Sequence, residues 1–343
     1  MEFNPNGVGM PNGNYFALPY TPEESNVVLL SVPWDVTTSY APGTADGPQA
    51  ILDASPQLDL YDPFVKDAWK VGIGTLPIDE DWRAKSAELR ELAEDVIERL
   101  ENGEQETSSA IVKHLKTINT ASEALNEYVY EEAKEWIEKG KIVGVVGGEH
   151  SVPFGLIKAL SEKHEGLGIL HIDAHCDLRV AYEGFTYSHA SIMYNVLDKL
   201  PKVDRLVQVA VRDFSEEEID FAMNHPKVVP FTDFEIAEEK FQGMTWHEQC
   251  EQIIEQLPSN VYISFDIDGL TPDNCPTTGT PVPGGLSYQE AIYLLKLVAE
   301  SGRKIVGFDL VEVAPAEEGE WDANVGARLL YKLCNLAYKS ANK

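Results

Sequence analysis

Three short motifs rich in histidine, aspartate or glutamate directly follow apolar runs in this 343-residue sequence. They are HIDAHCD at 171–177, SFDIDG at 264–269 and GGEHS at 147–151. In extended backbone, side chains two residues apart share a face, so Asp173, His175 and Asp177 can point into one crevice. The same rule pairs Asp266 with Asp268. Carboxylate and imidazole groups in this pattern predict the ligation of metal ions.

Together the motifs supply four carboxylates and two imidazoles as candidate ligands: His150, Asp173, His175, Asp177, Asp266 and Asp268. So much negative charge in one partly buried pocket requires cations, and two divalent ions would balance four carboxylates. Ligation dominated by oxygen favours manganese, whereas more thiolate or histidine would favour zinc. Taken singly, each motif has a simpler explanation, because aspartate often caps a helix after a strand and a lone histidine usually lies in the core or at the surface.

The elements that must position these side chains follow from the hydrophobic pattern. Short β-branched runs predict strands at 26–32, 141–146, 167–172, 205–211, 227–231, 261–267 and 304–311. Most of these runs are continuously apolar, as expected for strands that helices cover on both faces. Helical spacing predicts helices at 84–101, 120–138, 153–163, 188–200, 288–301 and 322–338. The sequence therefore predicts a three-layer α/β/α sandwich around a mainly parallel sheet.

All three motifs lie at the carboxyl ends of predicted strands, where open α/β sheets place their ligand crevices. We expect one domain over residues 1–343, because no Ser/Gly linker interrupts the alternation of strands and helices. An acidic, mostly helical excursion at about 79–117 departs from that alternation. The irregular stretch 271–286 contains four prolines and is a candidate binding loop.

Composition excludes several classes of function. The 27 Lys and Arg residues face 57 Asp and Glu, and the formal charge of −30 opposes binding to nucleic acid or anionic lipid. No apolar run is long enough to span a membrane, and the first 20 residues lack the features of a secretory signal. Four cysteines without a Cys-x-x-Cys pair disfavour disulfides and thiolate zinc sites. We expect a cytoplasmic protein that attracts a small cation.

The order of the motifs resembles the ureohydrolase (arginase and agmatinase) family of binuclear manganese amidinohydrolases. The resemblance includes DLVEVAP at 309–315, VPWDVTTSYAPGTADGPQAI at 32–51 and TGTPVPGGLS at 278–287, and it spans nearly the whole chain apart from the excursion. It implies the arginase-like fold and two Mn²⁺ ions per chain. One ion would be held by His150, Asp173, Asp177 and Asp266. The other would be held by His175 and Asp268, with Asp173 and Asp266 bridging the two.

The resemblance also implies catalytic roles for three residues. His189, in YSHAS, matches the histidine that shuttles protons, although a histidine at a helix N-terminus is the simpler explanation. Glu312, in LVEVAP, matches the glutamate that pairs with the substrate guanidinium, although it could form a structural ion pair. Asp268 would help to stabilise the intermediate formed when a metal-bridging hydroxide attacks the guanidinium carbon. Glu149 stands where many members carry aspartate, which predicts an adjustment beside the ligands.

The segment LRVAYEGFTYSH, at 178–189, bears on the tail of the substrate. It lacks the Ser-Gly-Asn stretch with which arginases hold the amino acid carboxylate, and it is more similar to prokaryotic agmatinases. The resemblance thus implies hydrolysis of agmatine to putrescine and urea, a reaction of polyamine biosynthesis. Arg179 could instead grip a carboxylate, although we expect it to pair with a nearby acidic residue.

Other readings stay open. The same chemistry could act on guanidinobutyrate, arginine or formiminoglutamate. The chain could also be a catalytically silent metal-binding regulator, or a deacetylase of similar architecture with a single zinc. The resemblance implies a homo-oligomer, either a trimer or a hexamer.

Overall fold

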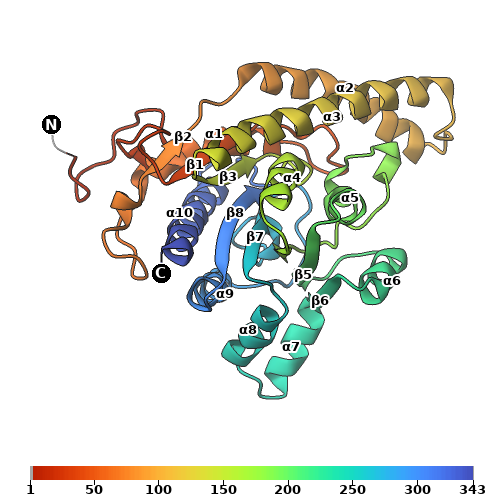
Figure 1. Cartoon of the computed structure of the whole chain (residues 1–343). Helices are drawn as coiled ribbons and strands as arrows, with labels where there is room; N and C mark the ends of the chain where they lie inside the picture. Colours follow the sequence, from red (N-terminus) through yellow and green to blue (C-terminus); the bar gives the residue numbers. More distant parts are fainter. Residues whose placement is uncertain (1–2, 343) are drawn as a thin grey trace.

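An eight-stranded sheet forms the centre of the protein in a computed structural model that describes residues 3–342 (Figure 1). The strands are β1 (Val27–Val32), β2 (Ile73–Thr75), β3 (Ile142–Gly147), β4 (Leu167–Ile172), β5 (Val203–Val211), β6 (Val228–Thr232), β7 (Asn260–Asp266) and β8 (Lys304–Val311). Their order is β2-β1-β3-β8-β7-β4-β5-β6, and every neighbouring pair is parallel. The prediction of a mainly parallel sheet is confirmed.

Helices cover both faces of this sheet. One layer contains α1 (Gly47–Ala54), α7 (Asp233–Phe241), α8 (Trp246–Glu255), α9 (Tyr288–Glu300) and α10 (Trp321–Ala341). The opposite layer contains α2 (Glu80–Glu101), α3 (Ser109–Glu138), α4 (Phe154–Lys163), α5 (Ile192–Lys199) and α6 (Glu216–Asn224). Each layer packs its own cluster of buried apolar side chains against the strands. This arrangement confirms the three-layer sandwich.

The sequence patterns missed several short elements. Strand β2 has three residues and pairs with β1 alone, so it is too short to show a strand pattern. Helices α1, α6, α7 and α8 span only eight to ten residues each. The last three begin with capping boxes, in which a Ser or Thr side chain and a Glu three residues later cap each other's backbone. This signature was present in the sequence and could have located them.

The excursion at 79–117 contains α2 and the first turns of α3, which begins at Ser109 and therefore well before the predicted start at 120. Its outer face is exposed, but α2 buries Leu89, Ala93 and Val96. Arg90 of α2 donates a hydrogen bond of 2.8 Å to the hydroxyl of Thr38. The excursion therefore braces the loop that follows β1.

Strand order brings the carboxyl ends of four central strands side by side. Ile172 of β4 pairs with Phe265 of β7, Asp266 of β7 with Val311 of β8, and Val146 of β3 with Leu310 of β8. The residues that follow these pairs carry the three motifs and Glu312. Segments more than 100 residues apart in the chain thus end at one edge of the sheet.

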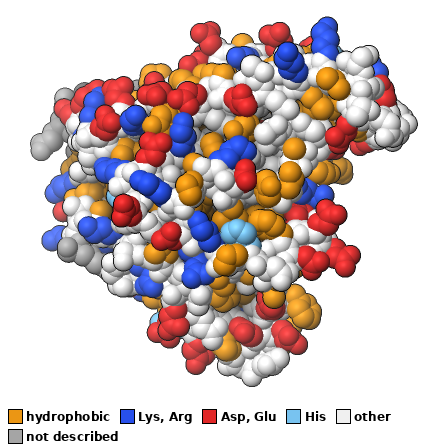
Figure 2. Space-filling model, turned by 45° about the vertical axis from the view of Figure 1, so that its right-hand side comes forward, with side chains coloured by type: hydrophobic (Ala, Val, Ile, Leu, Met, Phe, Trp, Pro, Cys, Tyr) orange, Lys and Arg blue, Asp and Glu red, His pale blue; other side chains and the backbone are white. Residues whose placement is uncertain are grey.

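The surface carries the excess of acidic residues in a dispersed form. Figure 2 shows Asp and Glu side chains spread over the visible face and interspersed with Lys and Arg, so they form no single acidic patch on that face. Within residues 3–342, none of the helices combines the length and the apolar character needed to cross a membrane.

Candidate active site

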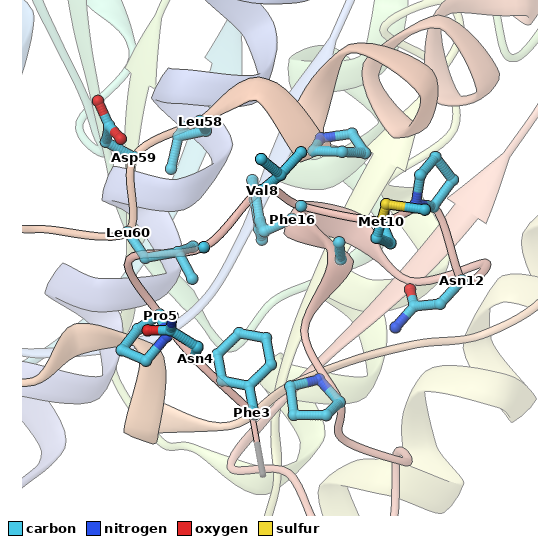
Figure 3. Close-up of a pocket in the computed structure, with 16 residues that line it drawn as sticks. Phe3, Asn4, Pro5, Val8, Met10, Asn12, Phe16, Leu58, Asp59 and Leu60 are labelled. Carbon is cyan, nitrogen blue, oxygen red and sulfur yellow. The ribbon is translucent and has the colours of Figure 1, made fainter. Parts of the chain in front are cut away.

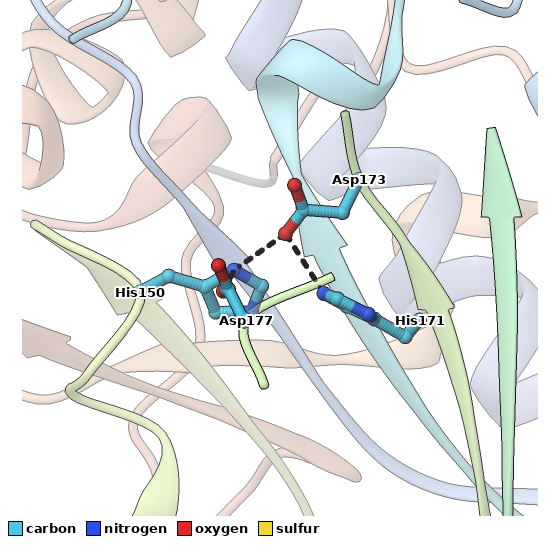
Figure 4. Close-up of side chains that lie close together, drawn as sticks. All are labelled: His150, His171, Asp173 and Asp177. Atoms are coloured by element: carbon cyan, nitrogen blue, oxygen red, sulfur yellow. Dashed lines mark hydrogen bonds and ion pairs between the residues drawn. The ribbon is translucent and has the colours of Figure 1, made fainter. Parts of the chain in front are cut away.

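His150 lies at the turn between β3 and α4. A side chain at Gly148 would bring its Cβ to 2.1 Å from the carbonyl oxygen of Trp34, so this tight turn requires glycine. Three carboxylate oxygens lie around the Nδ1 atom of His150: Asp173 Oδ2 at 2.9 Å, Asp177 Oδ2 at 3.1 Å and Asp266 Oδ2 at 3.3 Å. Figure 4 shows the carboxylate of Asp173 turned toward both His150 and His171. The three motifs therefore meet at one ring nitrogen.

A second cluster lies beside the first and shares one of its carboxylates. The Nδ1 atom of His175 is 3.1 Å from Asp268 Oδ2 and 3.4 Å from Asp173 Oδ1. Asp173 thus presents one oxygen to His150 and the other to His175. The structure brings all six predicted ligands together.

The backbone that carries Asp173, His175 and Asp177 differs from the extended conformation that the spacing predicted. Strand β4 ends at Ile172, and Asp177 has a φ of +54°, so residues 173–177 do not continue as regular extended backbone. The side chains converge because an irregular loop turns them inward. Cys176, between two of the ligands, is fully buried in the apolar cluster. A left-handed non-glycine residue at such a place is conformational strain of the kind that clusters at functional sites.

Hydrogen bonds fix the orientation of the His150 ring. Ser264 Oγ donates to the Asp309 carboxylate at 2.9 Å, so its single proton is committed there. The Nε2 atom of His150, 2.8 Å from the same hydroxyl, must therefore be the donor of that contact. In the neutral ring, Nδ1 then presents a lone pair to three carboxylate oxygens. That arrangement is repulsive unless a proton on Nδ1 or a metal cation lies among them.

Burial supports the same conclusion. His150, Asp173 and Asp266 are each 3% exposed or less. Burial raises the pKa of Asp266 well above its ordinary value, and the negative charges of Asp268 and Asp173 add to the rise. Burial would lower the pKa of His150, but the surrounding carboxylates outweigh it and raise that pKa. Carboxylates held this close need compensating cations, and an oxygen-rich donor set with imidazole fits divalent ions such as manganese.

His171 belongs to the cluster but was not predicted as a site residue (Figure 4). Its Nε2 atom is 2.8 Å from Asp173 Oδ2. The amide nitrogen of Gln208 donates to the carbonyl oxygen of Cys176 at 2.8 Å and lies 3.0 Å from His171 Nδ1. Because that nitrogen can only donate, Nδ1 accepts and the proton of the neutral ring sits on Nε2. His171 therefore holds Asp173 in place by donating to it. His171 stands two residues before Asp173, and the rule that side chains two apart share a face could have identified it as a neighbour of that ligand.

Replacement of His171 by phenylalanine is expected to weaken the affinity for Mn²⁺ by about 10–100-fold, because such supporting contacts orient the ligand carboxylate. Isothermal titration of the metal-free protein measures the effect. His247→Phe, at an exposed histidine outside the cluster, is the matched control. Loss of one whole ion per chain would instead make His171 a ligand, and unchanged affinity would contradict the supporting role.

The two other predicted catalytic residues border the same clusters. His189 Nδ1 lies 3.8 Å from Glu312 Oε1, and its Nε2 lies 3.2 Å from Ser39 Oγ. Glu312 follows β8 with a φ of +60° and accepts a hydrogen bond of 2.9 Å from the backbone of His150. Burial lowers the pKa of His189 to about 3, and the positive charges of His175 and His150 add to that effect. The imidazole of His189 is therefore unprotonated at neutral pH.

Glu149 lies beside His150 and is fully buried. Its carboxylate accepts from the backbone nitrogen of Thr37 at 2.7 Å and from the Thr37 hydroxyl at 2.9 Å. That hydroxyl in turn accepts from the backbone nitrogen of His189 at 3.0 Å. Glu149 thus anchors the loop that positions His189.

One cavity of about 170 Å³ contains these groups. Its lining includes the predicted residues His150, His175, Asp177, His189, Asp266 and Glu312. Tyr182, from the segment predicted to bear on the substrate tail, lines it too, as do residues that the sequence patterns did not identify, among them Ser39, Asp213, Phe214 and Glu218. Arg179 lines it too and lies 3.3 Å from Glu218, so the prediction that Arg179 pairs with an acidic residue is confirmed.

The proline-containing stretch 271–286 reaches the cavity through Thr280. Arg212 ties this stretch to the SFDIDG motif, because its Nη2 atom donates to the carbonyl oxygens of Asp268 at 2.7 Å and Val282 at 3.0 Å. The candidate binding loop is therefore held at the site.

A larger cavity of about 370 Å³ lies elsewhere, among the N-terminal residues and the segment after α1 (Figure 3). Phe3, Val8, Phe16 and Leu60 line it, and none of the predicted site residues does. The predicted metal ligands and catalytic residues therefore lie at the carboxyl edge of the sheet and not in this larger cavity.

Comparison with known proteins agrees with this geometry. A sequence model described as the Arginase family matches residues 25–335. The N(1)-aminopropylagmatine ureohydrolase of Thermus thermophilus is 32% identical over 316 residues, which cover 92% of this chain and 91% of that protein. The agmatinase of Bacillus anthracis is 30% identical over 297 residues, covering 85% of each.

Solved structures show the same fold. The agmatine ureohydrolase of Thermoplasma volcanium has a TM-score of 0.73 at 24% identity and covers 96% of both chains. The arginase of Bacillus cereus has a TM-score of 0.67 at 24% identity, covering 90% of this chain and 98% of that one. The prediction of an enzyme of the ureohydrolase class is confirmed, and this chain belongs to the arginase family.

Proposed function

We propose that this protein hydrolyses the guanidino group of a small cationic amine, with agmatine as the simplest substrate, to give urea and putrescine with two Mn²⁺ ions. One observation carries the proposal: the two His/Asp clusters share Asp173 and open into the cavity that also contains His189 and Glu312. The relatives support a guanidino amine, because those of Thermus and Bacillus are named for aminopropylagmatine and agmatine.

The metal ligands in this proposal are the six predicted residues. His150, Asp173, Asp177 and Asp266 would hold one ion, and His175 and Asp268 the other, with Asp173 and Asp266 shared. A pair of bound ions supplies a water nucleophile that is active near neutral pH.

The remaining residues act on the substrate. Glu312 binds the guanidinium, whose positive charge favours the ionised form of this buried carboxyl group. The neutral His189 accepts a proton released by the attacking water and delivers it to the departing amine nitrogen as the bond between carbon and that nitrogen breaks. Asp213, whose carboxylate makes no ion pair within residues 3–342, lines the cavity and favours a cationic tail.

An assay of product release tests the proposal. Manganese-loaded protein is offered agmatine, arginine, guanidinobutyrate and free guanidine with urea as the readout, and formiminoglutamate with formamide as the readout. Agmatine is expected to give a higher kcat/KM than these other four compounds. No product from any of the five would overturn the proposal.

Metal analysis separates the other readings. Two ions per chain together with urea release support the ureohydrolase. One zinc would indicate the deacetylase, and two ions without turnover would indicate a silent regulator. The proposal also includes a cytoplasmic location and a homo-oligomer, either a trimer or a hexamer. Light scattering of the purified protein measures the oligomeric state.

A further inference from the structure

The helical excursion presents two polar side chains to the loop that follows β1. They are Ser86 and Arg90, which lie one turn apart on α2 and therefore on the same face of that helix. Ser86 is 1% exposed, and its hydroxyl accepts a hydrogen bond of 3.1 Å from the backbone nitrogen of Asp35. Arg90 Nη1 donates to the Thr38 hydroxyl at 2.8 Å, to the carbonyl oxygen of Val36 at 3.3 Å and to the carbonyl oxygen of Thr38. Helix α2 thus fastens the backbone of this loop.

The fastened loop holds His189. The Asp35 carboxylate accepts a hydrogen bond of 2.8 Å from the backbone nitrogen of Gly43, so the loop is closed at its base. Between these two residues, Thr37 Oγ1 accepts from the backbone nitrogen of His189 at 3.0 Å. Ser39 Oγ lies 3.2 Å from His189 Nε2. The backbone and the ring of His189 are therefore both held by the loop that α2 fastens.

Helix α3, which runs beside α2, holds the segment that leads to His189 (Figure 1). Asn119 of α3 donates to the carbonyl oxygen of Gly184 at 3.0 Å and accepts from the backbone nitrogen of Thr186 at 2.9 Å. A Cβ added to Gly184 would lie 2.5 Å from the side chain of Leu115, so this segment is in direct contact with α3. The two helices therefore fasten the two segments that meet at His189.

The charge of Arg90 is compensated on the outer side of α2. Its Nε atom lies 3.1 Å from Oε1 of Glu94, whose side chain is 55% exposed. The Arg90 side chain itself is 12% exposed. Among residues 3–342, those that line the cavity around His189 and Glu312 do not include Arg90. Its contacts with the loop are therefore the route by which Arg90 affects the cavity.

We propose that Arg90 is a positioning residue for the reaction, which holds the loop that follows β1 so that Thr37 and Ser39 keep the His189 imidazole in place for proton transfer. The helical excursion then orders the proton carrier in addition to covering the sheet. This inference rests on the proposed function and adds to it the residue on which the position of His189 depends. A displacement of about 1 Å at a catalytic group lowers a rate by up to about 100-fold.

Replacement of Arg90 by methionine keeps most of the apolar stem and removes the guanidinium. The variant is expected to keep the metal content and the KM for agmatine of the wild-type protein, while kcat falls by about tenfold. Arg90→Lys still donates to the carbonyl oxygens of the loop and should recover part of kcat. Arg99→Met is the matched control, because it removes an arginine of α2 whose partners Asp95 and Glu104 are partly exposed, and it should keep the wild-type kcat.

A double-mutant cycle separates positioning from a general loss of stability. If Arg90 acts through His189, Arg90→Met lowers kcat in the wild-type background but has no further effect on the His189→Ala protein. An equal fall in both backgrounds would show that Arg90 only supports the fold, and an unchanged kcat in the wild-type background would also overturn the inference. Where Arg90→Met does not fold, Arg90→Lys is taken through the same cycle.

A crystal structure of the Arg90→Met protein gives a readout that does not depend on turnover. We expect the loop to be displaced and Ser39 Oγ to lie beyond hydrogen-bonding distance of His189 Nε2. An unchanged contact between these two atoms would overturn the inference while product release from the wild-type protein keeps the proposed function. Absence of product from the wild-type protein is the failure of the proposed function itself, and a displaced loop would then still show that Arg90 positions His189.

Discussion

Replacement of Asp266 by alanine is expected to remove bound metal and abolish turnover. Asp266 Oδ2 lies 3.3 Å from His150 Nδ1, while its Oδ1 accepts from the backbone nitrogen of Asp268 at 2.9 Å. The substitution therefore removes one ligand and releases the turn that positions another. Loss of metal assistance worth several kcal/mol corresponds to a fall in kcat/KM of about 10³-fold or more. Elemental analysis of the purified variant, together with urea release, measures both effects.

Two further variants sharpen this prediction. Asp266→Asn keeps the size of the side chain and the contact with Asp268, so it should retain the fold while binding metal more weakly. Asp220→Ala removes an exposed aspartate from α6, outside the cavity lining, and should retain both metal and activity. An Asp266→Ala protein with two ions per chain and full turnover would show that Asp266 is not a ligand.

Replacement of His189 by alanine is expected to keep the metal and slow the reaction. His189 is the proposed proton carrier, and such groups typically contribute about 10²–10⁴-fold to the rate. Because burial lowers the pKa of His189 to about 3, its ring is in the proton-accepting form across the neutral range. The loss should therefore appear in kcat, with a smaller change in KM, and added imidazole should restore part of the rate.

The controls for His189 come from its surroundings. Ser39→Ala removes the hydroxyl 3.2 Å from His189 Nε2 and should have a smaller effect than loss of the ring. His247→Ala, at an exposed histidine, should have none. Metal content must stay at the wild-type level in His189→Ala. Unchanged kcat in that variant would refute the role of proton carrier.

Much of the fold could be predicted because its signals are local. Seven of the eight strands lie in β-branched runs that the sequence shows, and most of these runs are apolar, as expected for strands that helices cover on both faces. The missed elements lack such a signal. Strand β2 depends on pairing with β1, and α1 has eight residues and no side-chain cap at its start.

The sequence by itself determined which side chains are available as ligands and that they stand at the ends of strands. Parallel strands direct their carboxyl ends to one edge of a sheet, so Asp173, Asp266 and His150 lie along the same edge once those strands form. Only the tertiary structure decided the neighbours of these residues. Strand order places β8 between β3 and β7, which brings Glu312 to the backbone of His150.

The same distinction explains the remaining site residues. The pair formed by Arg179 and Glu218 depends on how α6 packs against the loop after β4, and the bond from His171 to Asp173 depends on Gln208 of β5. Spacing along a chain specifies a face, whereas a hydrogen bond between distant segments requires that their positions in space be known. Local sequence therefore determines which residue types the site contains, and packing decides their supporting contacts.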